Sequence, residues 1–462
     1  MSTDSFQMKH EEVDVVVVGA GFAGLTAALR LTQATPPKSV IVLEARDRVG
    51  GRVYTETLKD GTWLDFGGTW FGPGQEYSYA LAKEMGVETY PTYNQGDALT
   101  VLDGGEIIRK PWSFPLADLC PAATALALLD ELESMARQVP LDAPWKAAKA
   151  REWDRQTFAA WAHSQLDDDS SALAEMALNT IMMGFFCIDT AELSLLDALY
   201  LVHSHGGFVH LMAVQGGAQQ DRIKGGAQTI ADRIHARLGN AVRLNSPVRQ
   251  ITQDGDGVEV VSDTGTVRAR RVIMAIPPTL AGHLRYDPPL PAERTLLLQR
   301  VPVGSVIKVL AKYDEPFWRK EGLSGQSFAA TDPVGATFDG CTDTGKPGLM
   351  IAFSFGTHAR ALARLSKEER ERTFLDALVK RFGPQAASPS LYHEIEWSEQ
   401  TWSQGGIFAH FPPGVLTSFG SVLREPTGRI HWAGTETSTL FHGSINGAIQ
   451  SGERAAREVL QA

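Results

Sequence analysis

The sequence predicts an α/β protein with a Rossmann-like domain, and three observations near its amino end support this class. A β-branched run at 13–18 leads directly into Gly-x-Gly-x-x-Gly at 19–24, and an Ala/Leu-rich segment continues to Leu31. A second apolar run, 40–43, then ends at Glu44. This order predicts a strand, a tight turn, a helix, a second strand and an acidic residue, which is the arrangement of a dinucleotide-binding βαβ unit.

Each residue type in this unit has a physical role in holding a dinucleotide. Gly19 allows the sharp turn, Gly21 lets the backbone approach a pyrophosphate, and Gly24 permits close packing of the helix on the strand. Unpaired N–H groups at the start of the helix then bind phosphate charge. Glu44 is placed to accept hydrogen bonds from ribose hydroxyls. A structural βαβ unit without a nucleotide is the alternative. A membrane span is excluded, because glycines interrupt an apolar core that is too short.

Length, charge and cysteine content narrow the class of protein. A chain of 462 residues is too long for one compact core, so two domains are expected. The net charge of −11 and a pI near 5.6 argue against a nucleic-acid partner. The three cysteines, Cys120, Cys187 and Cys341, are too far apart to predict a disulfide framework or a metal cluster, which favours a reducing compartment. Because the polar amino end lacks an apolar signal core, we expect a cytoplasmic protein without a membrane anchor.

Two further segments contain residues suited to a bound nucleotide. The stretch 45–52 reads ARDRVGGR, in which Arg46 and Arg52 are placed to meet phosphate or ribose oxygens. Two solvated arginines on a loop are the alternative. The stretch 63–70 alternates in hydrophobicity and then breaks at Gly67-Gly68, which suggests a backbone that passes close to a flat ring.

These segments resemble the flavin-dependent amine oxidase family. The resemblance rests on LEARDRVGGR and DFGGTWFGP near the amino end and on HWAGTETS near the carboxyl end. The animal monoamine oxidases are the most similar pattern, and the likeness is densest in 13–90, 215–310 and 396–460. The resemblance implies FAD as the cofactor. It also implies a Rossmann-like FAD-binding domain in three discontinuous segments and an α+β substrate-binding domain.

The resemblance also divides the chain. It places the FAD-binding domain at 1–89, 222–297 and 398–462, and the substrate-binding domain at 90–221 and 298–397. Within the second domain, Ala/Leu/Glu-rich segments predict helices at 122–136 and 171–180. His203, His205 and His210 lie close together in the sequence and could suggest a metal site. No acid or cysteine at ligand spacing supports this interpretation. No metal is expected.

The site residues follow from the same resemblance. Lys308 ends an apolar strand, and the matching lysine of the family hydrogen-bonds a water that contacts flavin N5, so it is the predicted catalytic residue. The alternative is an edge-strand lysine that reaches solvent. Gln219, Ile407 and Ser444 are expected to line the substrate cavity. The residues expected to bind the cofactor are Gly19, Gly21, Ala23, Gly24, Glu44, Ala45, Arg46, Gly51, Arg52, Gly68, Thr69, Val248, Trp397, Gly434, Glu436, Ser444 and Ile445.

Two departures from the family pattern bear on the chemistry. The animal enzymes bind their flavin covalently through a cysteine, and the matching residue here is Gly406, which has no nucleophile. A dissociable FAD is therefore expected. Those enzymes also hold the substrate amine between two tyrosines, and the matching residues here are Ile407 and Ser444. Losing this aromatic cage predicts bulkier aliphatic, cyclic or long-chain amines as substrates.

The resemblance implies oxidative deamination of a primary or secondary amine, with O₂ reduced to H₂O₂. Three alternatives stay open: a flavin amine dehydrogenase that uses another electron acceptor, an L-amino-acid or polyamine oxidase, and a non-catalytic flavin-binding module. No arginine stands out to hold the carboxylate of an amino acid. A homodimer is compatible with the sequence, and neither a nucleic acid nor a membrane is an expected partner.

Overall fold

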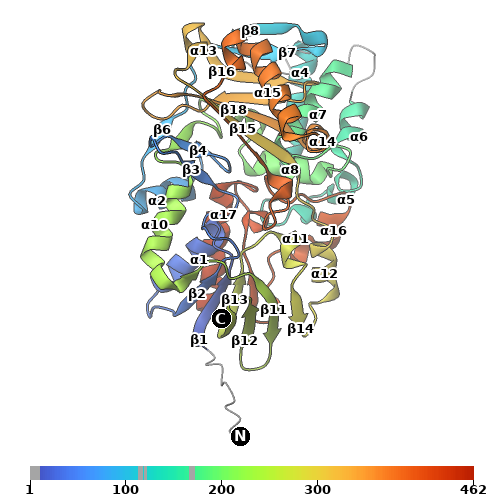
Figure 1. Ribbon diagram of the computed structural model, residues 1–462. Coiled ribbons are helices and arrows are strands. Elements are labelled where there is room, and N and C mark those ends of the chain that lie inside the picture. Colours follow the sequence, from blue (N-terminus) through green and yellow to red (C-terminus); the bar gives the residue numbers. More distant parts are fainter. Residues whose placement is uncertain (1–10, 113–117, 119–121, 166–171) are drawn as a thin grey trace.

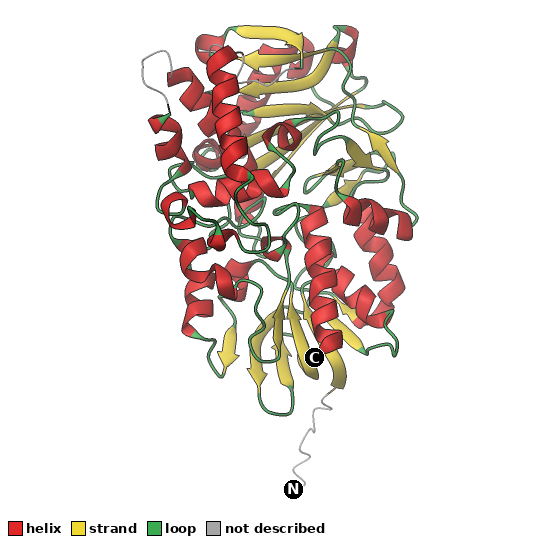
Figure 2. Cartoon of the chain, turned by 180° about the vertical axis from the view of Figure 1, so that it is seen from behind, coloured by secondary structure: helices red, strands yellow, loops and turns green. Residues whose placement is uncertain are grey.

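The computed structural model describes residues 11–112, 118, 122–165 and 172–462. Two sheets lie one above the other in the elongated molecule, with both sets of strands flanked by helices (Figures 1 and 2). Of the sequence expectations, those for Cys120 and Ser171 fall on residues outside this described part. In the described part, no helix is long and apolar enough to cross a membrane.

The lower sheet in Figure 1 is the predicted Rossmann-like α/β unit. Strand β1 (Glu11–Val18) pairs in parallel with β2 (Val40–Leu43) on one side and with β13 (Gly265–Met274) on the other. The sheet order is β10-β2-β1-β13-β12-β11-β14, and β20 pairs with β13. The additional strands are β10 (Val242–Arg243), β11 (Val248–Gln253), β12 (Val258–Ser262), β14 (Arg285–Asp287) and β20 (Ile430–Trp432).

The valine run forms β1 because both faces of this central strand are covered. Val15 and Val17 pack into a cluster with α1 (Phe22–Thr32) and α17 (Ile445–Gln461), whereas Val16 and Val18 pack into a cluster on the other face. A continuous apolar run rather than an alternating one is what a strand buried on both faces requires. Helix α10 (Gln228–Leu238) also packs on α1.

The upper sheet has the order β19-β15-β18-β17-β16-β7-β8. Strand β15 (Val306–Tyr313) lies between β18 (Gly348–Phe355) and β19 (Leu391–Glu396), and its Lys308 pairs with Phe353 and Ile395. The remaining strands are β17 (Ala336–Asp339), β16 (Leu323–Ala329), β7 (Asp97–Val101) and β8 (Ile107–Pro111). Lys308 therefore belongs to an interior strand, not to an edge strand.

A helical cluster packs beside the upper sheet. It includes α4 (Ala122–Ala136), which has the predicted bounds, and α7 (Ala172–Phe186), which continues past the predicted end at 180. The continuation follows from the apolar residues 181–186, which are largely buried in the same cluster. Residues 408–423 of the carboxyl-terminal part also pack into this helical cluster.

The other strands are short, whereas the other helices range in length from 4 to 16 residues. The strands are β3 (Thr55–Thr57), β4 (Trp63–Asp65), β5 (Trp70–Phe71), β6 (Thr89–Pro91) and β9 (Asp221–Ile223). The helices are α2 (Glu76–Glu84), α5 (Ala150–Trp153), α6 (Phe158–Ser164), α8 (Leu195–Ser204), α9 (Phe208–Met212), α11 (Pro278–Ala281), α12 (Ala292–Leu298), α13 (Phe317–Lys320), α14 (Gly356–Leu362), α15 (Lys367–Phe382) and α16 (Val415–Phe419).

Candidate active site

A cavity of about 700 Å³ is lined by residues of both sheets and of the loops between them. Its lining begins at the Gly-x-Gly-x-x-Gly turn, continues along 43–53 and 66–70, and includes Lys308 of the upper sheet. Segments that are far apart in the sequence therefore meet around one space. A cavity of this size is typical of a site for a small ligand or cofactor.

The glycine turn at one end of the cavity has the geometry that the sequence predicted. Gly19 has φ +98°, and a Cβ there would lie 2.7 Å from Ile276 Cγ2. A Cβ on Gly24 would lie 2.0 Å from the Gly19 carbonyl oxygen, so only glycine allows this approach of helix to strand. No side chain caps the amino end of α1, which starts after Gly21. Its first N–H groups are therefore left for an anion.

Glu44 and Arg46 lie at the adjacent edge of the cavity. The buried Glu44 carboxylate accepts hydrogen bonds from the backbone N–H of Ala20 at 2.7 Å and of Arg46 at 2.9 Å. The Arg46 guanidinium donates to the Trp402 carbonyl at 3.2 Å and to Ser403 Oγ at 2.7 Å, and burial lowers its pKa. Glu44 is thus pinned beside the turn, and Arg46 joins the 402–403 loop to the nucleotide end of the cavity.

Arg52 and Glu436 form an ion pair. Arg52 Nη1 and Nη2 donate to the two Glu436 oxygens at 2.6 and 3.1 Å, and Nη1 also donates to the Ile407 carbonyl at 3.1 Å. The Ala409 N–H donates to Glu436 at 3.1 Å. Burial raises the pKa of Glu436, but Arg52 and these hydrogen bonds outweigh that effect and lower it overall. Arg52 lines the cavity, whereas Glu436 lies behind its wall and holds the 407–409 loop.

Lys308 is buried, with only 2% of its surface exposed. Its Nζ donates to the Gly67 carbonyl at 2.9 Å and to Thr69 Oγ1 at 2.6 Å, and it lies 5.4 and 5.3 Å from the ring centroids of Trp70 and Phe353. Burial lowers its pKa to about 7, with Asp65 opposing and Arg222 reinforcing the shift. The lysine can therefore change its charge near neutral pH, and it does not reach solvent.

The predicted substrate-lining residues also border the cavity. Gln219 Nε2 donates to the Leu211 carbonyl at 3.1 Å, whereas its buried Oε1 has no partner among the described residues. Ile407 is 42% exposed. The Ser444 hydroxyl donates to the Phe441 carbonyl at 2.6 Å and caps α17 by accepting from the Gly447 N–H at 3.2 Å.

All but two of the predicted cofactor-binding residues line the cavity. The two exceptions are Gly24, which packs against Gly19, and Glu436, which faces Arg52. The others lie on the lining: Gly19, Gly21, Ala23, Glu44, Ala45, Arg46, Gly51, Arg52, Gly68, Thr69, Val248, Trp397, Gly434, Ser444 and Ile445. Trp397 is fixed by its ring N–H, which donates to the Phe66 carbonyl at 3.0 Å.

Sequence reasoning missed an aromatic wall at the cavity. His442 is fully buried and lines the cavity, with its ring centroid 5.1 Å from those of both Phe408 and Tyr200. Burial lowers the pKa of His442 to about 4, so the imidazole is neutral at physiological pH. Gly443 makes this wall feasible, because a Cβ there would lie 2.4 Å from the Phe408 ring. In the sequence, the only signal for His442 is that it lies two residues before Ser444, which was expected to line the substrate cavity.

These residues fit the FAD that the resemblance implies. The uncapped start of α1 matches a pyrophosphate, and the fixed Glu44 carboxylate matches a ribose. The cavity continues from there to Lys308, as a ring joined to the nucleotide requires. The closely packed Gly67 and Gly68 pass along the same wall, where a Cβ on Gly68 would lie 3.2 Å from Ile445. Among the described residues, no group of three His, Cys, Asp or Glu side chains could hold a metal.

Comparisons with known proteins give the same picture. A family model described as flavin-containing amine oxidoreductase matches residues 22–460. Amine oxidase [flavin-containing] B of Canis lupus familiaris is 39% identical over 465 residues, which cover 97% of this chain and 86% of that protein. A wild-type putrescine oxidase bound to putrescine superposes with a TM-score of 0.91 at 35% identity, covering 98% of this chain and 99% of the other. Cyclohexylamine oxidase from Brevibacterium oxydans IH-35A gives 0.92 at 35% identity, covering 97% and 99%.

Proposed function

Since this chain belongs to the family of flavin-containing amine oxidoreductases, we propose that it oxidises a bulky aliphatic, cyclic or long-chain amine to an imine and reduces O₂ to H₂O₂. The protein is an oxidoreductase with FAD as its cofactor. The observation that carries the substrate proposal is the cavity next to Lys308, where Ile407 and Ser444 leave the space that an aromatic pair would narrow. The imine then hydrolyses in water to an aldehyde or ketone.

The chain's own residues prepare the amine for oxidation. Trp70 and Phe353 border the Lys308 end of the cavity, and such an apolar wall disfavours the ammonium form of a substrate. The neutral amine has the lone pair that the oxidation of its α-carbon requires. When bound, FAD supplies the acceptor for the hydrogen of that carbon and passes the electrons on to O₂.

Lys308 has capacity for one more polar contact. Its Nζ donates two hydrogen bonds, to Gly67 and Thr69. The charged form then has a third N–H available, and the neutral form has a lone pair available. Either form holds a water molecule at the cavity. We propose this as the catalytic contribution of Lys308.

The structural neighbours support an alkylamine substrate. One is bound to putrescine, a short aliphatic diamine, and another is a cyclohexylamine oxidase, so both act on saturated amines. The exposed Ile407 side chain and the small Ser444 side chain suit a saturated chain or ring at this position. We infer that arylethylamines are poorer substrates, because the two tyrosines that hold them are missing.

The same comparison of residues leads us to propose a dissociable FAD. Gly406 has no nucleophile, and a Cβ at this position would lie 2.8 Å from Val306 Cγ1 and 3.3 Å from Trp397 Cβ. Acid precipitation of the purified yellow protein tests this proposal. FAD is expected in the supernatant, and yellow colour that stays in the protein pellet would contradict it.

An amine panel with peroxide detection tests the proposed function. Cyclohexylamine, putrescine and long-chain amino alcohols are compared with benzylamine and phenethylamine by kcat/KM, and Lys308→Met, in which flavin reduction or reoxidation should be strongly slowed, is assayed beside the native enzyme. The proposal is wrong if the compact arylalkylamines are oxidised with the higher kcat/KM. If flavin is reduced by amines but no H₂O₂ forms in air, the enzyme is a dehydrogenase instead.

Three further proposals concern the whole protein. The segments 1–89, 222–297 and 398–462 are proposed as the FAD-binding domain, and 90–221 with 298–397 as the substrate-binding domain, which limited proteolysis with mapped fragments tests. A cytoplasmic location is tested by cell fractionation. A homodimer is tested by sedimentation of the FAD-loaded protein.

A further inference from the structure

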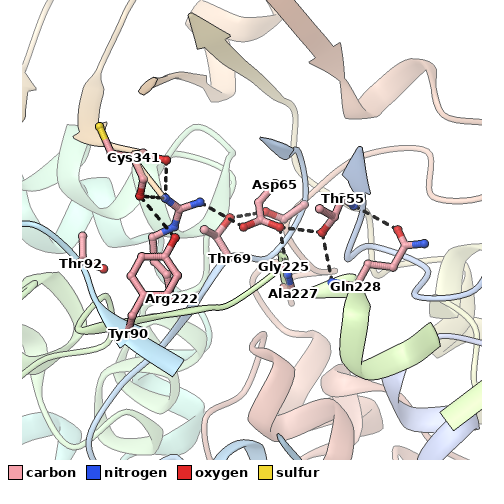
Figure 3. Close-up of polar contacts among 12 residues, drawn as sticks. Thr55, Asp65, Thr69, Tyr90, Thr92, Arg222, Gly225, Ala227, Gln228 and Cys341 are labelled. Atoms are coloured by element: carbon pink, nitrogen blue, oxygen red, sulfur yellow. Dashed lines mark hydrogen bonds and ion pairs between the residues drawn. The ribbon is translucent and has the colours of Figure 1, made fainter. Parts of the chain in front are cut away.

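Figure 3 shows a buried ion pair between Arg222 and Asp65, a few residues before the backbone that accepts hydrogen bonds from Lys308. Arg222 Nη2 donates to Asp65 Oδ2 at 3.2 Å, and the two side chains are 1% and 0% exposed. Neither residue is part of the cavity lining. Because a buried pair of this kind is costly to desolvate, stability alone is a weak reason for its presence.

Asp65 connects β3 to the segment that precedes α10. Its Oδ1 accepts from Thr55 Oγ1 at 2.6 Å and from the Ala227 N–H at 3.0 Å, next to the start of α10. Thr55 in turn exchanges two hydrogen bonds of 3.1 Å with Gln228. These hydrogen bonds fix the position of the carboxylate (Figure 3).

Arg222 anchors the pair to the loop after β17. Its Nη1 donates to the Cys341 carbonyl at 2.9 Å and also contacts the Gly340 carbonyl. Its guanidinium carbon lies 5.7 Å from the centroid of the Tyr90 ring, and the Tyr90 hydroxyl donates to the same Cys341 carbonyl at 3.3 Å. The pair therefore joins the 65–69 segment to a loop of the upper sheet.

A short stretch of backbone connects Asp65 to the acceptors of Lys308. Asp65 ends β4, and the chain then passes through Gly67 and Thr69, the two residues that accept hydrogen bonds from Lys308 Nζ. This stretch is packed closely, because a Cβ on Gly67 would lie 2.1 Å from the Arg52 carbonyl oxygen. Fixing Asp65 therefore fixes the position of the lysine amine.

The pair also acts on the charge of Lys308. Burial lowers the pKa of the lysine, the Asp65 carboxylate attracts the ammonium and raises it, and the Arg222 guanidinium repels the ammonium and lowers it. Asp65 has the larger effect of the two. Because the two charges oppose one another, removing either one alone leaves the other uncompensated.

Other ionisable groups near β15 face elsewhere or carry no charge. Glu394 and Glu396 flank Ile395, the register partner of Lys308 on β19, so their side chains point to the opposite face of the sheet. Glu394 is paired with Arg370. On β18 the partner of Lys308 is Phe353, and Tyr54 nearby stays neutral because burial raises its pKa. Within the described residues, Asp65 and Arg222 are the charges that act on Lys308.

We propose that the Asp65–Arg222 ion pair is a positioning element that holds Lys308 at the cavity and sets how readily its amine changes charge. The proposal rests on the proposed role of Lys308. Neither residue touches the cavity, so both would act on the reaction only through the lysine. An amine balanced between its two forms can take up or release a proton at Nζ during turnover.

Competitive acetylation measures the charge of Lys308 without depending on activity. The FAD-loaded enzyme is treated with trace acetic anhydride across about pH 5 to 11, which spans the ordinary lysine range. The chymotryptic peptide that contains Lys308 is then quantified by mass spectrometry, with exposed Lys59 as the internal standard. Only the neutral amine reacts, so the labelling midpoint reports the pKa of Lys308, which is expected at about 7.

Two single variants should shift this midpoint in opposite directions. Asp65→Asn removes the attraction and should lower it by about one to two pH units, whereas Arg222→Met removes the repulsion and should raise it by about one unit. Thr55→Val deletes a hydrogen bond to Asp65 without changing a charge, and its midpoint should stay within about half a unit of the native value. Shifts in the same direction, or no shift in either variant, would overturn the proposal.

A double variant keeps the test decisive if a single variant does not fold. Asp65→Asn combined with Arg222→Gln leaves no buried charge without a partner. Its midpoint should fall below the native value, because Asp65 has the larger effect, and an unchanged midpoint would overturn the proposal. Peroxide formation is measured separately. An enzyme that oxidises no amine but shows the opposed shifts refutes the proposed function and leaves the role of the pair intact.

Discussion

Replacing Lys308 by methionine is expected to stabilise the protein at neutral pH, although it should slow flavin reduction or reoxidation strongly. Burial lowers the pKa of Lys308 from 10.5 to about 7 in the folded state. A folded-state pKa below the unfolded one means that the unfolded chain binds the proton more tightly. The resulting cost to stability is present in full below about pH 7, and it fades as the pH rises towards the unfolded lysine value of about 10.4.

The magnitude follows from the pKa difference and from two hydrogen bonds. A difference of roughly 3.5 pH units corresponds to a cost of about 5 kcal/mol at or below neutral pH. Methionine removes this cost but also leaves the Gly67 and Thr69 acceptors without their donor, which costs about 1–2 kcal/mol for each acceptor. The net expectation is a gain of about 1–3 kcal/mol in the free energy of unfolding at pH 7.

Guanidinium unfolding of the FAD-saturated proteins, followed by tryptophan fluorescence at several pH values, measures this difference. The advantage of Lys308→Met should shrink between about pH 7 and 10, because the folded protein holds a neutral lysine there and the free energy that the unfolded chain gains by staying protonated falls with each pH unit. Lys312→Met on the same strand is the control. Its side chain is 17% exposed and paired with Asp60, so we expect a change of about 1 kcal/mol or less. A variant less stable than the native protein at pH 7, or a pH-independent difference, would refute the reasoning.

Four other substitutions, two of them combined in one variant, test the site. Glu436→Gln should lower the free energy of unfolding by about 1–3 kcal/mol, because it leaves Arg52 without its carboxylate partner. The pKa of Glu436 is lowered in the folded protein, so the native protein should lose stability as the pH falls below about 4.5. This loss should be absent from the variant. Ile407→Tyr should shift kcat/KM towards arylalkylamines by about tenfold, and adding Ser444→Tyr should extend the shift while costing about 1 kcal/mol through the lost cap of α17. Gly24→Ala should abolish stoichiometric FAD binding, read from flavin absorbance, because its Cβ would lie 2.0 Å from a carbonyl oxygen.

Each of these substitutions has a control or a contrary outcome. Gly255→Ala has no heavy atom within 4 Å of its added Cβ, so it should bind FAD normally, and normal binding by Gly24→Ala as well would disprove the packing argument. Thermal unfolding of Glu436→Gln that matches the native protein at pH 7 would mean that the ion pair contributes nothing. An unchanged order of amine preference in Ile407→Tyr would remove this residue from substrate selection.

Local constraints explain how much of the nucleotide end was predictable. The family resemblance, the fold class and FAD are confirmed. Gly19 and Gly24 could be placed because the turn and the close approach are set by a few neighbouring residues. The acidic residue at 44 could be placed because a strand and a helix of standard length separate it from the turn. These features are encoded within some thirty residues of chain.

Long-range contacts explain what was not predictable. Arg52 and its partner Glu436 lie 384 residues apart in the sequence, in two different motifs. These motifs identified both residues but did not indicate that Glu436 faces the arginine and not the cavity. The aromatic wall at His442 depends on Phe408, which belongs to another loop. No periodicity within one element encodes which faces of different elements meet.

Lys308 combines both kinds of information. The sequence by itself placed Lys308 in an apolar strand and located the Gly-Gly segment and the glycine turn, because these depend on residue type and spacing. The prediction that Lys308 ends its strand is wrong, because β15 starts at Val306 and continues past the lysine to Tyr313. Only the tertiary structure decided that β18 and β19 bury this lysine, that Gly67 and Thr69 accept its hydrogen bonds, and that Asp65 and Arg222 act on its charge. The reason is physical: a pKa depends on desolvation and on charges brought near by folding, neither of which is a property of the local chain.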